Sequence, residues 1–185
     1  MEIKQILLTD VLILEPDIHR DERGYFFESF NTKTSQKFGI DVTFKQDNES
    51  LSQKNVIRGL HLQLPPFQQG KLVRVICGSV LDVFIDLRKH SPTFLQNTSI
   101  VLSGDNKLVA WIPEGFAHGF LTLENNTIFS YKCSNYYNKP LERTILWNDP
   151  DFKIDWGVLP TNITLNEEKD ENLIIHLKDI YNLPF

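Results

Sequence analysis

Short apolar segments separated by turn residues recur along most of the chain. Turn signals such as Asp21-Glu22-Arg23-Gly24 and Leu64-Pro65-Pro66 fall between them. Each segment has the length and the β-branched or aromatic content of a strand. The predicted strands are Val11–Leu14, Gly24–Ser29, Thr43–Glu49, Val56–Gln63, Leu72–Cys77, Val80–Leu87, Thr98–Leu102, Leu108–Ile112, Gly119–Leu123 and Thr127–Cys133. Many short strands at this spacing are typical of a β-sandwich, jelly roll or barrel.

Helical periodicity is confined to Thr32–Phe38 and Glu167–Tyr181, the latter with Leu173, Leu177 and Ile180 on one face. Because no repeat, linker or low-complexity tract divides the chain, residues 1–185 are expected to form a single domain. The pattern predicts an all-β fold with a few short helices, mainly C-terminal.

The segment Ser79–Arg88 alternates in a way that leaves its surroundings open. Branched apolar residues share one face, whereas Asp82 and Asp86 lie on the other. In a barrel, such a face is either solvated or turned toward a polar cavity. Since carboxylates are rarely buried, the pattern alone favours a solvated outer face. Lys71, on the preceding strand, has the same two alternatives.

The composition is that of an ordinary globular protein. The chain has 185 residues, of which 41% are hydrophobic and 23% charged, and its net charge is −5. No overall positive field therefore draws it to nucleic acid or to an anionic membrane. A phosphate-bearing ligand would have to be met by a few local arginines and lysines.

Nothing in the sequence predicts a membrane span or a secretory signal. No apolar run approaches the length of a span, and the start, MEIKQILLTD, carries acidic residues and has no long apolar core. Cys77 and Cys133 are too few for a disulfide framework and are expected to be reduced thiols. These features favour a cytoplasmic location.

Two histidine segments raise the question of a metal site. Pro113-Glu114-Gly115-Phe116-Ala117-His118 fits the Pro-x-Gly-x-x-His segment of metal-binding barrels of the cupin type. Their other segment, His-x-His followed by Glu, is represented here by His61-Leu62-Gln63 without a following acid. Two histidines without a carboxylate or thiolate partner make a poor divalent site. We therefore expect a cupin-like fold without a metal.

Motifs that span nearly the whole chain identify a family. In order they are Asp21-Glu22-Arg23-Gly24-Tyr25-Phe26-Phe27-Glu28, Gln46-Asp47-Asn48-Glu49-Ser50, Arg58-Gly59-Leu60-His61, Gly70-Lys71-Leu72-Val73-Arg74, Asp86-Leu87-Arg88, Ser91-Pro92-Thr93-Phe94, the run from Trp111 to Phe120, Tyr131-Lys132, Asn135-Tyr136-Tyr137 and Trp147-Asn148-Asp149-Pro150. The chain resembles the dTDP-4-dehydrorhamnose 3,5-epimerases. The resemblance implies a cupin-like jelly roll, a homodimer with exchanged N-terminal strands, no cofactor, and dTDP-4-keto-6-deoxyglucose as substrate.

The chemistry implied by this resemblance needs a base, a donor at the ketone oxygen and an acid across the sugar ring. The resemblance assigns these roles to His61, Lys71 and Tyr131, respectively. It also gives Asp170 as the carboxylate that orients His61. The run Glu167–Glu171 is equally typical of a solvated helix start, so both interpretations of Asp170 stay open.

The remaining predicted site residues bind the substrate. Guanidinium groups match phosphate in a bidentate way, which lets a net-acidic protein hold a diphosphate. By resemblance, the diphosphate contacts are Arg23, Arg58 and His118, the sugar or nucleoside contacts are Glu28, Gln46, Asp47 and Asn48, and the stacking or rim residues are Phe26, Tyr137, Glu142 and Lys169. Phe26 could equally be a core residue, and Tyr136 competes with Tyr137 for a place in the pocket.

Other functions fit parts of the same pattern. Within the fold, the alternatives are a 3- or 5-mono-epimerase or a 3,4-ketoisomerase acting on related dTDP-sugars. From another class, a non-catalytic sugar-nucleotide-binding cupin would keep the phosphate contacts and lose the base or the acid. His61, Lys71 and Tyr131 together favour epimerisation over ketoisomerisation, although similar residues also serve single epimerisation. The presence of both the base and the acid disfavours the non-catalytic cupin.

The spacing of Arg58 and His61 is a problem for a single site. In a regular strand an odd step of three residues would point the two side chains to opposite faces. We predict that Gly59 interrupts the alternation as a bulge or local twist, so that both side chains face one pocket.

Overall fold

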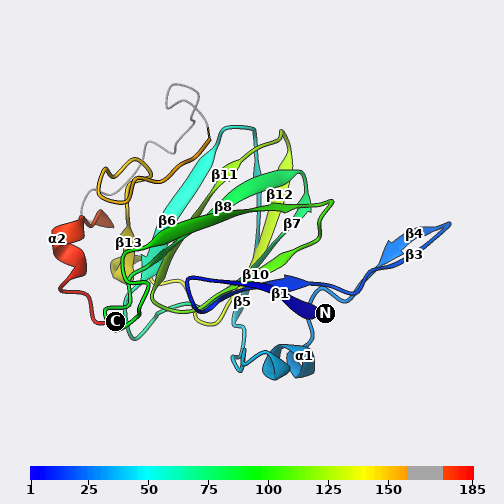
Figure 1. Cartoon of the computed structure of the whole chain (residues 1–185), viewed down its shortest axis with the longest axis horizontal. Helices are drawn as coiled ribbons and strands as arrows, with labels where there is room; N and C mark the ends of the chain where they lie inside the picture. Colours follow the sequence, from blue (N-terminus) through cyan, green and yellow to red (C-terminus); the bar gives the residue numbers. More distant parts are fainter. Residues whose placement is uncertain (158–172) are drawn as a thin grey trace.

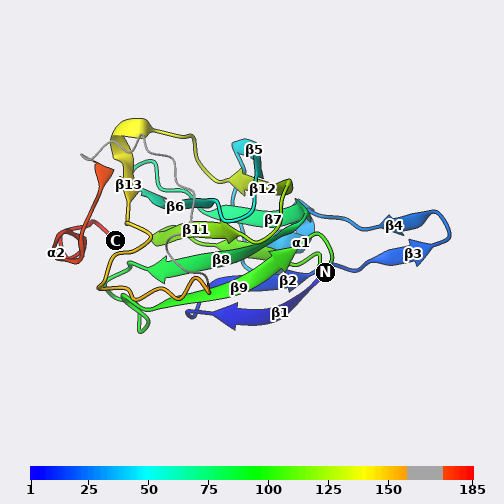
Figure 2. The same ribbon diagram turned by 90° about the horizontal axis from the view of Figure 1, so that it is seen from above.

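The computed structural model describes residues 1–157 and 173–185, and its main feature is a pair of facing antiparallel sheets (Figures 1 and 2). The larger sheet contains, in spatial order, β1 (Glu2–Leu7), β2 (Val11–Glu15), β10 (Val109–Ile112), β7 (Lys71–Cys77), β12 (Thr127–Cys133) and β5 (Gln46–Ser52). The smaller sheet contains β13 (Glu142–Thr144), β6 (Ile57–Gln63), β11 (Phe116–Thr122), β8 (Ser79–Asp86) and β9 (Asn97–Ser103). The predicted all-β, cupin-like jelly roll is confirmed.

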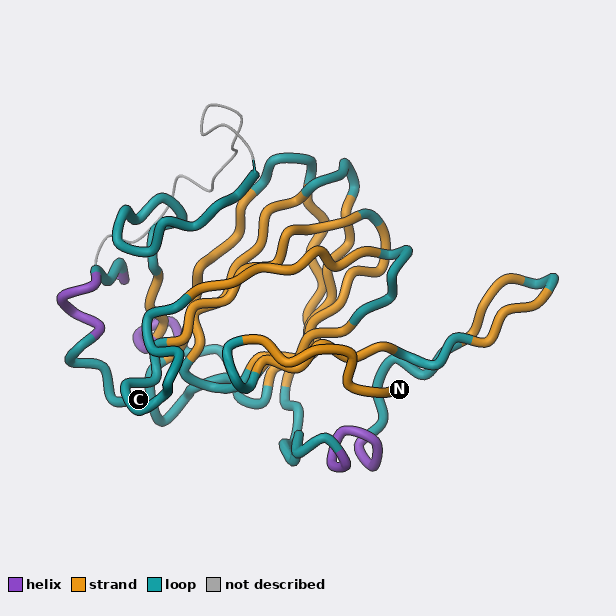
Figure 3. The backbone as a smooth tube through the Cα atoms, viewed as in Figure 1, coloured by secondary structure: helices purple, strands orange, loops and turns teal. Residues whose placement is uncertain are grey.

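Strands dominate the described chain, and helix is limited to short stretches (Figure 3). These are α1 (Thr32–Lys37), the 3-10 turn η1 (Lys139–Leu141) and α2 (Leu177–Ile180). Asn31 begins α1 because its side-chain oxygen accepts from the N–H groups of Lys33 and Thr34.

The alternation of each strand divides the apolar residues between separate clusters. Val73 and Val75 of β7 and Phe129 of β12 meet Phe84 and Phe120 of the smaller sheet in the space between the two sheets. The outer faces of the sheets are covered by other segments, including the region around α1 on the larger sheet and the C-terminal segment on the smaller one. Apolar side chains therefore fill part of the space between the sheets, and both polar and apolar residues line the rest.

The prediction of a helix over Glu167–Tyr181 is wrong for residues 173–176, which are not α-helical. Its first part, residues 167–172, lies outside the described residues. Ile174 forms a bridge with Thr144 of β13, and the Ile175 N–H donates to the Thr144 carbonyl at 2.9 Å. The helix α2 starts only after His176. The pairing of this segment with the edge strand β13 therefore outweighs the local helical periodicity of its sequence.

A hairpin arm projects from the body of the molecule. It is formed by β3 (His19–Asp21) and β4 (Gly24–Phe26), whose residues are all exposed (Figures 1 and 2). The ammonium of Lys107 donates to the hydroxyl of Tyr25, which pairs with Arg20 in this arm, at 2.9 Å. Since an isolated two-stranded hairpin is only marginally stable, its exposed surface is suited to contact with another chain.

Within the described residues, no helix has the length and apolar character needed to cross a membrane. The two thiols are both free, with Cys77 exposed and Cys133 buried.

Candidate active site

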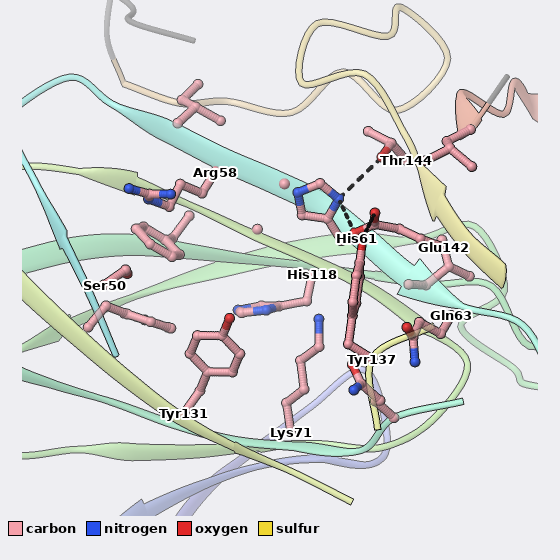
Figure 4. Close-up of a pocket in the computed structure, with 18 of the residues that line it drawn as sticks. Ser50, Arg58, His61, Gln63, Lys71, His118, Tyr131, Tyr137, Glu142 and Thr144 are labelled. Atoms are coloured by element: carbon pink, nitrogen blue, oxygen red, sulfur yellow. Dashed lines mark hydrogen bonds and ion pairs between the residues drawn. The ribbon is translucent and has the colours of Figure 1, made fainter. Parts of the chain in front are cut away.

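A cavity of about 450 Å³ opens between the two sheets and collects many of the predicted site residues (Figure 4). The smaller sheet contributes residues of β6, β11 and β13, and the larger sheet contributes residues of β5, β7 and β12. The predicted residues that line the cavity are Arg58, His61, Lys71, His118, Tyr131, Tyr137 and Glu142.

The irregularity predicted at Gly59 is present in β6. His61 pairs with His118 and Arg58 pairs with Phe120, so β6 has one more residue than β11 between the two pairs. Gly59 has a φ of 109°, in a region that favours glycine, and a Cβ there would lie 2.6 Å from the Gly119 Cα. The bulge lets Arg58 and His61 line the same cavity, which confirms the prediction.

His61 lies against a hydroxyl and a carboxylate from the neighbouring strand β13. Its Nδ1 is 3.2 Å from the Thr144 Oγ1 and 3.3 Å from the Glu142 Oε1. The other oxygen of Glu142 accepts a hydrogen bond of 2.9 Å from the Tyr137 hydroxyl. Burial, together with the bond to Glu142 and its negative charge, raises the pKa of Tyr137 to about 12. Tyr137 is therefore a neutral donor to a carboxylate that also faces the imidazole.

Lys71 and Tyr131 face His61 from the other wall of the cavity (Figure 4). Burial lowers the pKa of Lys71, an effect opposed by the nearby Cys133, Glu142 and Asp82. Burial is also the main cause that raises the pKa of Tyr131 above its ordinary value of 10.0. A neutral phenol and an ammonium group that gives up its proton readily thus lie on one side, and an imidazole on the other.

His118 and Asp82 form a buried pair at the base of the cavity. The His118 Nε2 is 2.7 Å from the Asp82 Oδ1, and their side chains are 7% and 0% exposed, respectively. Burial raises the pKa of Asp82, against the opposing effects of His118 and Lys71. The prediction of a solvated face for Asp82 is wrong, because the strand turns this face toward the cavity, where an imidazole and an ammonium compensate the carboxylate.

The same correction applies to Asp86, which is also fully buried. Its carboxylate accepts bonds from the Arg88 Nη2 at 2.8 Å, the Thr93 Oγ1 at 2.7 Å and the Ser91 Oγ at 2.5 Å. Burial alone would raise the pKa of Asp86, but these bonds outweigh it and hold the pKa below the ordinary value. Asp86 joins β8 to the loop that follows it and has no place in the cavity.

Several predicted binding residues do not line this cavity. Arg23 and Phe26 lie on the exposed arm, where the Arg23 side chain is 85% exposed and Phe26 is 70% exposed. Glu28 follows the arm and accepts from the Asn31 Nδ2 at 3.0 Å. Within one chain, the arm residues are thus separate from the cavity.

The predicted β5 segment lies next to the cavity wall. The Gln46 Oε1 accepts from the Tyr137 N–H, and Asn48 pairs in register with Tyr131. The Asp47 carboxylate instead bonds the Lys132 ammonium at 2.6 Å. Lys169 and Asp170 lie outside the described residues.

The structure adds cavity residues that the sequence did not indicate. Thr144 and Gln63 line the cavity, and Asp82 supports His118 from below. In the sequence, Gln63 was notable only because it occupies the position of the second histidine in the His-x-His metal-binding segment. Thr144 gave no signal, because its role depends on the pairing of β13 with β6.

The described residues contain no group of three or more histidine, cysteine, aspartate or glutamate side chains placed to hold a metal ion. The polar groups Thr144 and Glu142 contact the His61 imidazole itself, and Asp82 contacts that of His118.

Comparisons with known proteins agree with this arrangement. The family model described as dTDP-4-dehydrorhamnose 3,5-epimerase matches residues 5–178. A Shigella flexneri protein named dTDP-4-dehydrorhamnose 3,5-epimerase is 49% identical over 173 residues, which cover 93% of this chain and 94% of that protein.

Solved structures give the same result. A Legionella pneumophila dTDP-6-deoxy-D-glucose-3,5-epimerase in complex with dTDP-4-keto-L-rhamnose is similar with a TM-score of 0.90 and 44% identity, and the match covers 99% of this chain and 97% of that one. A 3′-monoepimerase from Streptomyces bikiniensis in complex with dTDP-quinovose is also similar, with a TM-score of 0.79 and 32% identity over 89% of this chain and 82% of that one.

Proposed function

The chain belongs to the dTDP-4-dehydrorhamnose 3,5-epimerase family, and we propose that it converts dTDP-4-keto-6-deoxy-D-glucose to dTDP-4-keto-L-rhamnose without a cofactor. The observation that carries this proposal is a single cavity with His61 on one wall and Tyr131 and Lys71 on the other (Figure 4). Inversion needs a proton to leave from one face of the sugar and return to the other. Facing acid and base groups suit that requirement.

The first step is removal of a proton from a carbon next to the 4-keto group, with His61 as the base. An imidazole suits this role because its unperturbed pKa lies near the working pH. The oxygens of Thr144 and Glu142 against Nδ1 favour the tautomer with a proton on Nδ1, in which Nε2 is the basic nitrogen. Once His61 is protonated, the Glu142 carboxylate stabilises the imidazolium. Asp170 is proposed as a further orienting carboxylate.

The electrons released from the C–H bond move to the ketone oxygen, which becomes an enolate. Lys71 is the proposed partner of that oxygen, since an ammonium in a buried site stabilises developing negative charge strongly. Its lowered pKa also makes it a better hydrogen-bond donor to the oxygen. The carboxylate of Asp82, at the base of the cavity, counterbalances the charge of Lys71.

Reprotonation from the opposite face is assigned to Tyr131. The raised pKa of Tyr131 keeps its hydroxyl protonated at neutral pH, as an acid requires. The same sequence of steps at the second carbon next to the ketone gives the 3,5-inverted product.

The diphosphate and nucleoside are proposed to extend from the cavity toward its rim. Arg58 and His118 are the proposed phosphate contacts of the chain's own cavity, and Tyr137 and Glu142 are the proposed rim contacts, with Lys169 beside them. The β5 residues Gln46, Asp47 and Asn48 complete the proposed set.

We also propose that the protein is a homodimer with exchanged N-terminal strands and that each arm reaches the partner's cavity. The support is the exposed arm, which bears Arg23 and Phe26 away from the chain's own cavity. Arg23 and Glu28 would then bind the partner's ligand, and Phe26 would supply a stacking face. We further propose that the protein is a single-domain cytoplasmic enzyme. Its free thiols are consistent with the reducing cytoplasm.

The test is to incubate the purified protein with dTDP-4-keto-6-deoxyglucose and to identify the product by NMR. The expected product is inverted at both carbons 3 and 5. Inversion at one carbon would instead support a mono-epimerase, and a carbonyl moved from carbon 4 to carbon 3 would support a 3,4-ketoisomerase. Binding without conversion would support a non-catalytic cupin.

A further inference from the structure

Gln63 is a buried amide at the end of the strand that carries His61. It lies two residues after His61 on β6, pairs in register with Glu142 of β13, and is only 6% exposed. Its side chain lines the cavity, close to Tyr137 (Figure 4). A buried amide must find hydrogen-bond partners, because an unsatisfied one is costly.

The amide finds its partners in the backbone of two loops. The Gln63 Nε2 donates to the Phe67 carbonyl at 2.6 Å and to the Tyr136 carbonyl at 3.0 Å. The Gln63 Oε1 accepts from the Asn138 N–H at 2.6 Å. Both amide hydrogens and the oxygen are therefore used, and the partners fix which end of the amide is the nitrogen.

These bonds hold the chain on both sides of Tyr137. One goes to the peptide carbonyl before Tyr137 and another to the peptide N–H after it. The N–H of Tyr137 itself donates to the Gln46 Oε1. Tyr137 as a whole remains 54% exposed at the rim of the cavity, with its hydroxyl bonded to Glu142.

We propose that Gln63 is a positioning residue, which holds Tyr137 at the rim so that its ring can stack on the nucleoside base of the substrate. The inference rests on the proposed function, because it takes a nucleotide-sugar as the ligand. Aromatic stacking is strongest when the ring is already in place before binding, since the loop then loses little freedom. The amide suits this task because a carboxylate would face two carbonyl oxygens, and an apolar side chain would bond neither loop.

The test measures the affinity for dTDP by calorimetry and KM and kcat for dTDP-4-keto-6-deoxyglucose in Gln63→Met, which keeps the size and removes the hydrogen bonds. Stacking on an aromatic side chain typically contributes enough that its loss raises Kd and KM about tenfold, while kcat changes less than about threefold. Gln53→Met, a control at an exposed glutamine that bonds Asn126, is expected to change none of the three.

A double-variant cycle separates positioning from general damage to the fold. Tyr137→Ala alone is expected to raise Kd as much as Gln63→Met, and the combined variant no further, because Gln63 acts through Tyr137. An additive double variant, or an unchanged Kd in Gln63→Met, would overturn the inference.

A second variant and the binding of dTDP by the unsubstituted protein complete the test. If Gln63→Met does not fold, Gln63→Glu keeps the shape and the acceptor for Asn138, removes both donors, and is expected to weaken dTDP binding in the same way. If the unsubstituted protein does not bind dTDP, the proposed function fails, and the inference fails with it.

Discussion

The buried carboxylates Asp82 and Asp86 lie in the same alternation of β8, with Phe84 between them, yet serve different purposes. Asp82 bonds an imidazole at the cavity, whereas Asp86 bonds a guanidinium and two hydroxyls in the loop after β8. The sequence places both on one face but does not show what that face meets. The partners of Asp86 are local in sequence, but His118 reaches Asp82 only when β11 pairs with β8, so the solvated alternative could not be dismissed from the pattern.

At this scale we predict that Asp86→Asn lowers the free energy of unfolding by about 2 kcal/mol at neutral pH, because charged hydrogen bonds become neutral ones. The folded pKa of Asp86 lies below its ordinary value of 3.8. Its stabilisation is therefore complete above that value and is lost as the pH falls through the folded pKa. Urea unfolding should show the difference between wild type and variant narrowing as the pH falls from about 4 to about 2. Asp105→Asn, at an exposed turn, is the control, and a difference independent of pH would contradict the assignment.

Among the elements, β6 determines the site most directly. Its bulge brings Arg58 and His61 to one cavity, and its last residue, Gln63, bonds the loop that carries Tyr137. The glycine and the odd spacing were visible in the sequence, so the bulge could be predicted. The edge strands β1 and β13 could not be predicted from the sequence. Most residues of β1 are exposed, and β13 is a short polar segment that pairs only in the folded chain.

At the scale of this element, Gly59→Ala is expected to lower the free energy of unfolding by more than about 2 kcal/mol and to reduce turnover. An added Cβ would lie 2.6 Å from the Gly119 Cα and 2.7 Å from the His118 carbonyl oxygen, both backbone atoms that cannot move aside. Gly39→Ala is the matched control, since Gly39 also has a positive φ but no atom within 4 Å of its Cβ. Equal losses in the two variants would show that backbone strain alone, and not the contact with β11, matters at Gly59.

For the whole molecule, the cavity of one chain holds the proposed base, acid and enolate partner, whereas Arg23 and Phe26 lie on the arm. The motifs around both sets were recognisable in the sequence. The separation of the two sets could not be predicted, because a motif gives the order of residues along the sequence. It does not show which residues line the same cavity. The proposed exchanged dimer would bring the two sets together.

Mixed dimers test this exchange. His61→Asn and the double variant Arg23→Ala/Phe26→Ala should each have little activity alone. Random mixing should restore about a quarter of wild-type activity, because half the dimers combine the variants and each of these has one site with both an intact base and an intact arm. Activity no greater than the average of the two separate variants would mean that the arm does not serve the partner's site.

The central claim is that His61 removes the proton and Tyr131 returns it from the opposite wall. Turnover of dTDP-4-keto-6-deoxyglucose in deuterated water, followed by NMR, tests it most directly. The wild type should place deuterium at carbons 3 and 5 of the inverted sugar. Tyr131→Phe should still exchange deuterium into substrate of unchanged configuration, and His61→Asn should exchange none. Exchange at the wild-type rate in His61→Asn would contradict the account.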